Sequence, residues 1–246
     1  MSVDPILITG ASSDIGCALV RRVMSKPNPP IVIAHCFRTA KNLRSLQEEF
    51  GEKIQILEAD FSRSSSVSSM ADQIMTDHGT PAGIVHLPAL PLIYERFTKI
   101  SWERFANDLE VQVHSAVLLL QRFLPKMAKL PRARIVFMLS SVVHGVPPKY
   151  MSGYTTIKYA QFGLMRSLAA EYASSPVRIN AISPSMVETR FLREIAENAV
   201  ELSAAANPQS RNALPGDLLG AFDLLLSDES DYIHGIDIPI AAGSVC

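Results

Sequence analysis

Residues 5–16 of this chain, Pro5-Ile-Leu-Ile-Thr-Gly-Ala-Ser-Ser-Asp-Ile-Gly16, join a short apolar run to a glycine-containing turn. The apolar run has the length and composition of a buried β-strand. Helical spacing follows directly, because Ile15, Leu19 and Val23 fall on one face of a helix. Glycine permits a sharp turn and the close approach of a phosphate, and the first amides of a helix attract anions. This stretch therefore predicts a strand, a tight turn and a helix start that can bind a phosphate group.

The same alternation continues along the chain. Apolar runs predict strands at residues 5–9, 31–35, 54–58, 83–87, 135–140, 177–182 and 236–240. Helical patterns predict helices at residues 15–25, 40–50, 65–78, 103–128, 154–173, 191–204 and 215–227. Strands that alternate with helices indicate a parallel sheet covered on both faces. We therefore expect one Rossmann-like, doubly wound α/β domain over residues 1–246, with a seven-stranded parallel sheet.

Several polar or turn-forming residues fall at or just after the predicted strand ends. They are Gly10, Asp60, His86, Ser141 and Pro184. Ligands of open α/β sheets bind beyond the carboxyl ends of the strands, where the strand order reverses. We therefore expect these residues to share one composite site.

Ser141, Tyr154 and Lys158 supply the chemistry of this site. Tyr154 precedes Lys158 by four residues, which places both side chains on one face of a helix. Ser141 follows the apolar run Ile135-Val-Phe-Met-Leu139 and Ser140. A hydroxyl, a phenol and an ammonium group at one point suit proton transfer to or from a carbonyl or alcohol oxygen.

Composition narrows the class of protein. The chain has 246 residues, and its 48% hydrophobic and 19% charged residues are typical of a globular protein. Its formal net charge is −1, so neither a nucleic acid nor an anionic membrane is an expected partner. The start, Met1-Ser-Val-Asp-Pro5, lacks a basic-then-apolar signal segment, and the apolar runs are shorter than the roughly 20 residues that span a bilayer. Cys17, Cys36 and Cys246 form no Cys-x-x-Cys pair, so we expect reduced thiols, a cytoplasmic protein and no metal site.

Together these motifs resemble the short-chain dehydrogenase/reductase family over nearly the whole chain. The resemblance implies that Ser141, Tyr154 and Lys158 are catalytic, with Gln112 in the place of an asparagine that helps to hold a water in a proton relay. It also implies a nicotinamide cofactor that contacts Gly10, Ser12, Ser13, Asp14, Ile15, Gly16, Arg38, Asp60, Phe61, Leu87, Tyr154, Lys158, Pro184, Val187 and Thr189.

The chain departs from the family pattern at four places. Asp14 replaces the middle glycine of the cofactor turn, where it could cap the following helix. His86-Leu-Pro-Ala89 replaces the family's Asn-Asn-Ala-Gly, and Pro184-Ser185 replaces Pro-Gly. Gln112 replaces the asparagine of the relay. None of these changes removes a reacting group, so we interpret the chain as a divergent member.

The second strand indicates which nicotinamide is bound. An acid at its end would bind the ribose 2′-hydroxyl of NAD, but this strand ends in His35-Cys-Phe-Arg38. The guanidinium fork of Arg38, with His35 as a possible second donor, can pair with a 2′-phosphate. The expected cofactor is therefore NADP(H), with NAD less favoured.

The expected reaction is reduction of a ketone by NADPH. Tyr154 would protonate the oxygen, and Ser141 would hydrogen-bond to it. Lys158 and the positive charge of an oxidised nicotinamide would lower the pKa of Tyr154. In the family, the region that corresponds to residues 190–215 is a mobile lid, and the apolar residues here favour an acyl substrate such as a 3-oxoacyl thioester or a polyketide-like chain. An acidic acyl carrier would need a basic docking patch, for which Lys126, Lys129, Arg132 and Arg134 are candidates, although a solvated basic turn explains them equally well.

Two alternatives stay open. One is an NAD-dependent alcohol dehydrogenase that works in the oxidative direction. The other is a nucleotide-sensing or scaffold protein that kept the fold and lost turnover. Family members pair the helices that correspond to 103–128 and 154–173 between subunits, so we expect a homodimer or homotetramer.

Overall fold

Seven strands form one parallel sheet in the order β3-β2-β1-β4-β5-β6-β7 in the computed structural model, which describes residues 4–245. Every strand pairs in parallel with its neighbours. The strands are Ile6–Thr9 (β1), Val32–Cys36 (β2), Ile54–Glu58 (β3), Gly83–His86 (β4), Ala133–Met138 (β5), Val177–Pro184 (β6) and Asp237–Ile240 (β7). The predicted fold class is confirmed, and each predicted strand is present within two residues of its expected bounds.

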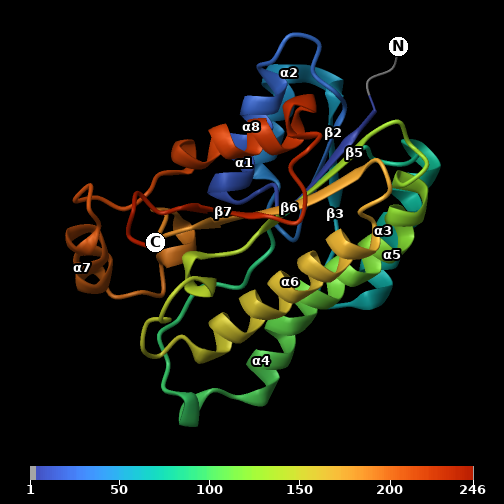
Figure 1. Ribbon diagram of the computed structural model, residues 1–246. Helices are drawn as coiled ribbons and strands as arrows, with labels where there is room; N and C mark the ends of the chain where they lie inside the picture. Colours follow the sequence, from blue (N-terminus) through green and yellow to red (C-terminus); the bar gives the residue numbers. More distant parts are fainter. Residues whose placement is uncertain (1–3, 246) are drawn as a thin grey trace.

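Helices cover both faces of this sheet (Figure 1). They are Asp14–Met24 (α1), Lys41–Phe50 (α2), Ser64–Asp77 (α3), Trp102–Leu109 (α4), Ser115–Met127 (α5), Ser152–Glu171 (α6), Glu197–Ala206 (α7) and Leu219–Leu226 (α8). In Figure 1, α1, α2 and α8 lie on one face and α3, α5 and α6 on the other, whereas α7 lies to the side of the sheet. This is the doubly wound arrangement that strand–helix alternation predicts.

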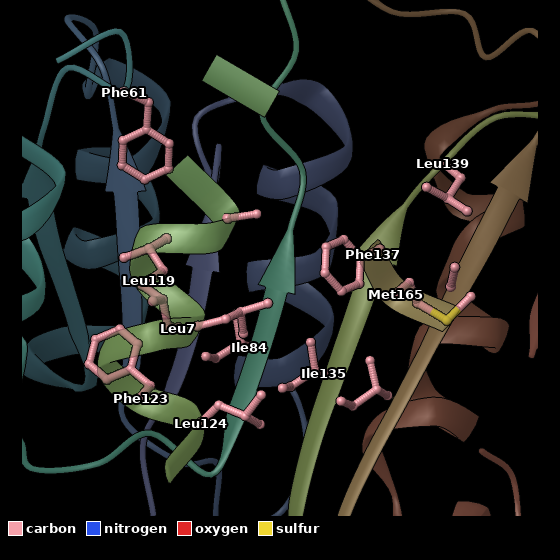
Figure 2. Close-up of a cluster of buried hydrophobic side chains, with 14 of the residues drawn as sticks. Leu7, Phe61, Ile84, Leu119, Phe123, Leu124, Ile135, Phe137, Leu139 and Met165 are labelled. Atoms are coloured by element: carbon pink, nitrogen blue, oxygen red, sulfur yellow. The ribbon is translucent and has the colours of Figure 1, made fainter. Parts of the chain in front are cut away.

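The core is divided by the sheet into two apolar layers. In one of them, Leu7 and Ile84 of the sheet pack with Leu119 and Phe123 of α5 (Figure 2). Phe123 is fully buried. Burial of a side chain of this size contributes about 1.5–3 kcal/mol, so these contacts hold α5 against the sheet. The second layer, which includes Phe222 of α8, fills the opposite face.

Three predicted helices differ from the structure. The helix expected over 215–227 starts as a 3₁₀ turn, Pro215–Leu218 (η6), and α8 begins at Leu219. The helix expected over 103–128 is divided into α4 and α5 by a π-helical segment, Glu110–His114 (η3). The helix expected over 191–204 begins only at Glu197, after a short 3₁₀ turn at Arg190–Leu192 (η5). A π segment cannot be read from hydrophobic spacing, because it adds a single residue to one turn.

The strand order reverses between β1 and β4, which are neighbours although they are separated by β2 and β3 along the chain. All strands run in the same direction, so their carboxyl ends share one edge of the sheet. Gly10, Asp60 and Ser141 follow β1, β3 and β5, while His86 and Pro184 end β4 and β6. The predicted gathering of these residues at one edge is therefore confirmed.

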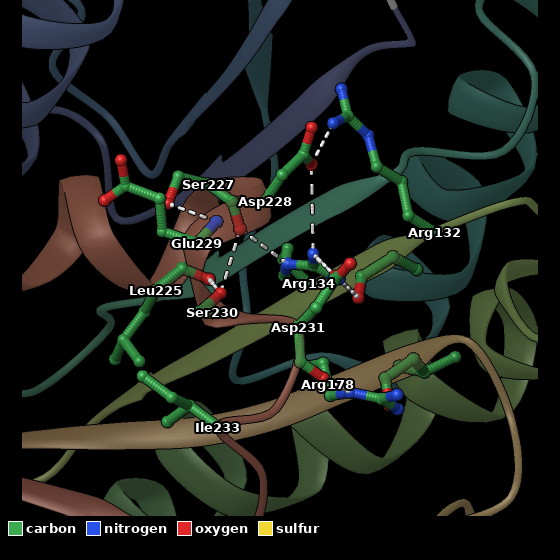
Figure 3. Close-up of polar contacts among 12 residues, drawn as sticks. Arg132, Arg134, Arg178, Leu225, Ser227, Asp228, Glu229, Ser230, Asp231 and Ile233 are labelled. Carbon is green, nitrogen blue, oxygen red and sulfur yellow. Dashed lines mark hydrogen bonds and ion pairs between the residues drawn. The ribbon is translucent and has the colours of Figure 1, made fainter.

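Arg132 and Arg134 of the basic segment 126–134 belong to an ion-paired structural cluster (Figure 3). Arg134 is buried, and its guanidinium pairs with Asp231 and donates to the Ser227 carbonyl at 3.0 Å. Arg132 pairs with Asp228. This cluster precedes and opens β5, at the edge of the sheet opposite to the strand carboxyl ends. Burial and ion pairing make Arg134 unavailable to a docking patch, whereas Lys126, Lys129 and Arg132 are exposed, so a docking patch for an acidic carrier stays a prediction for these three residues.

Within residues 4–245, no helix combines the length and the apolar character that crossing a bilayer requires. Cys36 is buried in β2 and Cys17 is half-buried in α1. Cys246 lies outside the described residues.

Candidate active site

A cavity of about 1030 Å³ opens at the carboxyl edge of the sheet. It is lined by residues from the turn after β1 and from the ends of β2, β3, β4, β5 and β6. Three of the predicted catalytic residues, Ser141, Tyr154 and Lys158, lie in its wall. The predicted cofactor residues that line it are Gly10, Ser12, Ser13, Asp14, Ile15, Arg38, Asp60, Phe61, Leu87, Pro184, Val187 and Thr189, in addition to Tyr154 and Lys158. Gly16 and Gln112 are not among the lining residues.

The glycines of the turn between β1 and α1 shape its backbone. Gly10 has a φ of +69°, in the left-handed region that favours glycine. A Cβ on Gly16 would lie 2.6 Å from Cα and O of Ala11, so only glycine fits there. The Ser13 hydroxyl caps α1 by accepting a hydrogen bond from the Gly16 amide at 3.0 Å. A tight turn that leads into a helix start beside a large cavity fits a dinucleotide pyrophosphate, and Gly16 shapes that turn from behind the wall.

Asp14 does not cap the helix, in contrast to the expectation that it could. Its carboxylate accepts hydrogen bonds from the backbone amide of Arg190 at 2.7 Å and from Arg190 Nε at 2.8 Å. The Arg190 guanidinium also donates to the Ser12 carbonyl at 3.1 Å. The pair offsets the negative charge beside the phosphate-binding turn, and it ties the start of segment 190–215 to that turn.

The end of the cavity beside β2 and β3 carries Arg38 and Asp60. The Arg38 guanidinium lies over the Phe37 ring, 4.4 Å from its centroid, and Arg38 forms no ion pair within residues 4–245. His35 cannot assist Arg38, since its Nδ1 accepts from the Gly10 amide and its Nε2 donates to the Ala59 carbonyl. Burial lowers the pKa of His35 to about 4, so the ring is neutral and supports the turn. The expectation of His35 as a second phosphate ligand is therefore wrong.

Tyr154 and Lys158 form the centre of the opposite end. The phenol of Tyr154 is buried, and its hydrogen-bond partner is the hydroxyl of Ser140. Lys158 Nζ lies 5.6 Å from the centroid of the Tyr154 ring and donates to the Met138 carbonyl at 2.9 Å. Ser141 lies one residue beyond Ser140 in the cavity wall, at the start of a 3₁₀ turn, Ser141–Val143 (η4). The chain thus presents two neighbouring hydroxyls rather than the one that was predicted.

Burial controls the charge of both groups. It raises the pKa of Tyr154 to about 12, with the hydrogen bond from Ser140 acting against it and the charge of Asp108 adding to it. It lowers the pKa of Lys158 to about 7, with the Asp108 carboxylate acting against it. The lowering of the Tyr154 pKa by Lys158 together with an oxidised nicotinamide stays a prediction, because desolvation is the largest influence on the phenol in the protein alone. Tyr154 is consequently a protonated phenol at neutral pH.

Gln112 lies in the π segment and is fully buried. Its Nε2 donates to Asp108 Oδ1 at 2.5 Å, while its Oε1 has no hydrogen-bond partner within residues 4–245. Its backbone carbonyl accepts from His86 Nε2 and from Gln161 Nε2, both at 2.9 Å. The amide nitrogen of Gln112 is thus bound to Asp108, and the water-holding role of Gln112 stays a prediction.

His86 is a buried packing residue. Its Nε2 lies against the Gln112 carbonyl and must donate, so Nδ1 of the neutral ring accepts from the Thr9 hydroxyl at 3.0 Å. Burial lowers the pKa of His86 to about 3, which keeps the ring neutral. His86 therefore joins the ends of β1 and β4 to the π segment.

The sequence did not single out Ser140, Gln161 or Arg190. Gln161 follows Lys158 by three residues, a spacing that places both on one helix face, so this signal was available. Arg190 is separated from Asp14 by 176 positions, and no local pattern links them. Within residues 4–245, no cluster of three or more His, Cys, Asp or Glu side chains is arranged to hold a metal ion.

Comparison with known proteins agrees with this geometry. A short-chain dehydrogenase family model described as enoyl-(acyl carrier protein) reductase matches residues 10–244. Nodulation protein G of Azospirillum brasilense is 27% identical over 99% of this chain and 98% of its own length. A cis-4-hydroxycyclohexanecarboxylate dehydrogenase of Sinomonas cyclohexanicum is 25% identical over 96% of this chain and 94% of its own.

Among solved structures, a 3-ketoacyl-(acyl-carrier-protein) reductase from Brucella melitensis, in complex with NADH, superposes with a TM-score of 0.86. It is 21% identical and covers 98% of each chain, a likeness that shows the shared fold. The match to the family model over nearly all of the chain, with the serine, tyrosine and lysine side by side in the cavity, shows that this protein belongs to the short-chain dehydrogenase/reductase family of NAD(P)-dependent oxidoreductases.

Proposed function

We propose that this protein reduces a ketone to a secondary alcohol with NADPH, and that its substrate is a 3-oxoacyl thioester or a polyketide-like acyl chain. The observation that carries this proposal is that Ser141, Tyr154 and Lys158 line one large cavity at the carboxyl edge of the sheet. Reduction needs an acid that releases a proton to the forming alkoxide, and a phenol with a pKa raised to about 12 holds its proton at neutral pH. Oxidation would need the phenolate, which burial disfavours.

In this mechanism each residue of the site has a separate task. The nicotinamide cofactor supplies the hydride. Tyr154 protonates the substrate oxygen, and Ser140 holds the phenol in place. Ser141 donates a hydrogen bond to the same oxygen and stabilises its developing charge. Lys158 binds the cofactor ribose with the N–H that its two protein acceptors leave free.

Apolar side chains on the substrate side favour an acyl chain. Pro88, Leu90 and Leu92 line the cavity on one side, and Phe191 and Leu202 line it from segment 190–215. The Phe191 ring lies 6.2 Å from the ring of Tyr154. We propose that segment 190–215 is a lid of the one domain, and that its closure excludes water from the proton transfer. Segment 126–134 precedes β5, at the edge of the sheet opposite to the cavity, so a carrier-linked substrate would approach at the lid.

Arg38 is proposed to select NADPH. Replacing it with Ala should weaken NADPH binding roughly 10- to 100-fold, since a charged hydrogen-bonded pair contributes about 1.5–3 kcal/mol. NADH binding should change little, because NADH has no 2′-phosphate. The measurement is a fluorescence titration of both nucleotides, with Arg44→Ala, an exposed arginine on α2, as the control.

The titration also tests the alternatives. Wild-type binding of NADH alone would favour an NAD-dependent alcohol dehydrogenase, an outcome to which the NADH in the Brucella reductase gives some weight. Binding of neither nucleotide would mean that Asp14 and the other departures have disabled the site, and would favour a scaffold protein without turnover.

We also propose a homodimer or homotetramer that pairs α4, α5 and α6 between subunits, in a cytoplasmic protein. Phe162 and Leu168 of α6 are only partly buried, whereas Leu120 and Leu124 of α5 belong to the core of the subunit. A subunit interface would therefore use the partly exposed residues. Light scattering at micromolar concentration should give at least twice the 26.9 kDa mass of one chain. A monomer at that concentration would contradict the assembly.

A further inference from the structure

Gln161 occupies a position that the mechanism above does not explain. It is fully buried on α6, one turn after Lys158. Its Oε1 accepts from Lys158 Nζ at 2.9 Å, and its Nε2 donates to the Gln112 carbonyl at 2.9 Å. A buried amide without partners costs about 1–3 kcal/mol. Its two matched contacts therefore fix the orientation of the amide: oxygen toward the lysine and nitrogen toward the π segment.

The contact with Gln161 occupies the second acceptor position of the Gln112 carbonyl oxygen. A carbonyl oxygen has two lone pairs, and here His86 Nε2 takes one and Gln161 Nε2 the other. No acceptor position remains on this oxygen for a water. The link between Lys158 and the π segment is consequently a side-chain amide, which transmits position but exchanges protons far less readily than water does.

Within residues 4–245, hydrogen bonds use two of the three N–H donors of the Lys158 ammonium group. An ammonium group has three N–H donors, and two of them point to the Met138 carbonyl and to Gln161 Oε1. Lys158 also lines the cavity, although it is only 2% exposed. Both protein acceptors are neutral, so neither neutralises the ammonium charge. The third N–H is thereby directed to the cavity.

Three titratable groups face Lys158 from the elements packed around it. Asp108 of α4 is the acidic one, and it is bonded to Gln112 Nε2. His86 at the end of β4 is neutral, and Tyr154 lies on the same helix. The side chain that accepts a hydrogen bond from the ammonium is none of these three groups but the neutral amide of Gln161.

We propose that Gln161 is a positioning residue for Lys158, which holds the ammonium toward the cavity and limits its proton exchange to the cavity side. The inference rests on the proposed role of Lys158 and deepens it. Because the Gln161 amide is neutral, it adds no negative charge beside the Lys158 ammonium. Because no carboxylate touches Nζ, burial can keep the pKa of Lys158 at about 7. The charge of Lys158 then changes within the physiological pH range.

The test uses two substitutions of similar size. Gln161→Glu places a carboxylate against the ammonium and should move the titration of Lys158 to higher pH by about one pH unit or more. Gln161→Leu removes the acceptor and should move it to lower pH. The limb of the kcat/KM pH profile that Lys158 sets should move in the same directions. Gln121→Glu, on the exposed side of α5, controls for added charge.

The titration is followed by NMR of isotope-labelled lysine in the full-length protein without cofactor, with Lys158→Arg to assign the signal. This readout does not depend on turnover, so failure of the proposed function leaves it interpretable. Should Gln161→Leu fail to fold, Gln161→Met supplies the flexible apolar replacement. An unchanged Lys158 titration in Gln161→Glu and in the apolar variant would overturn the proposal.

Discussion

Replacing Tyr154 with Phe should lower kcat by about 10²- to 10⁴-fold, the usual contribution of a positioned acid, and leave the affinity for NADPH within a few fold of the wild type. The substitution removes only the phenolic hydroxyl. The ring keeps its position near Phe191 and Lys158, so the cavity wall is preserved. Steady-state kinetics with a ketone substrate and a parallel nucleotide titration measure the two effects separately.

The control for this variant is Tyr159→Phe. Tyr159 lies on the same helix, is 44% exposed and donates a hydrogen bond to the Val143 carbonyl at 3.2 Å. Its loss should cost about 1 kcal/mol of stability and little activity. Turnover retained in Tyr154→Phe would mean that another group protonates the substrate, and the assignment of Tyr154 would fail.

Replacing Gly16 with Ala should damage the cofactor turn. The new Cβ would lie 2.6 Å from Cα and O of Ala11, and backbone atoms cannot move aside as a flexible side chain can. The turn must shift, at a cost of about 1–3 kcal/mol, and the amides that face the phosphate site move with it. We expect a lower free energy of unfolding and at least a roughly 10-fold loss of NADPH affinity.

Gly163→Ala is the matched control, because Gly163 lies within α6 and a Cβ there meets nothing within 4 Å. An alanine in a helix interior is about 0.5–1 kcal/mol more stable than a glycine, so this variant should unfold at equal or higher denaturant concentration. Equal stability and nucleotide affinity in Gly16→Ala and wild type would show that the turn tolerates a side chain and that its geometry is misjudged.

The sequence predicted the sheet well because its central strands are buried on both faces. β2 and β5 are buried at every residue, so their apolar runs carry a strong signal. The placement of Gly10, Ser141 and Pro184 at strand ends followed from chain direction alone. The site residues Ser141, Tyr154 and Lys158 were found because a strand end and one helix face bring them together.

The errors have a common physical origin in contacts between distant segments. Asp14 was interpreted as a cap because its partner Arg190 is remote in sequence. Arg134 resembled a surface charge, yet its aspartate partner is at position 231. The error at His35 is of another kind: the residue type suits a phosphate ligand, but both ring nitrogens of the buried side chain are already bound within the protein. A single sequence carries the residue type at such positions and not the direction of the side chain.

The central claim is that this cavity reduces a ketone with NADPH through Tyr154. Its most direct test is the oxidation of NADPH by the wild-type protein in the presence of a 3-oxoacyl thioester, with Tyr154→Phe measured in parallel. The account predicts thioester-dependent NADPH oxidation by the wild type and a loss of about 10² or more in the variant. NADPH oxidation at the same rate in both proteins would contradict it. So would a wild-type protein that binds NADPH but oxidises it with none of a range of ketones.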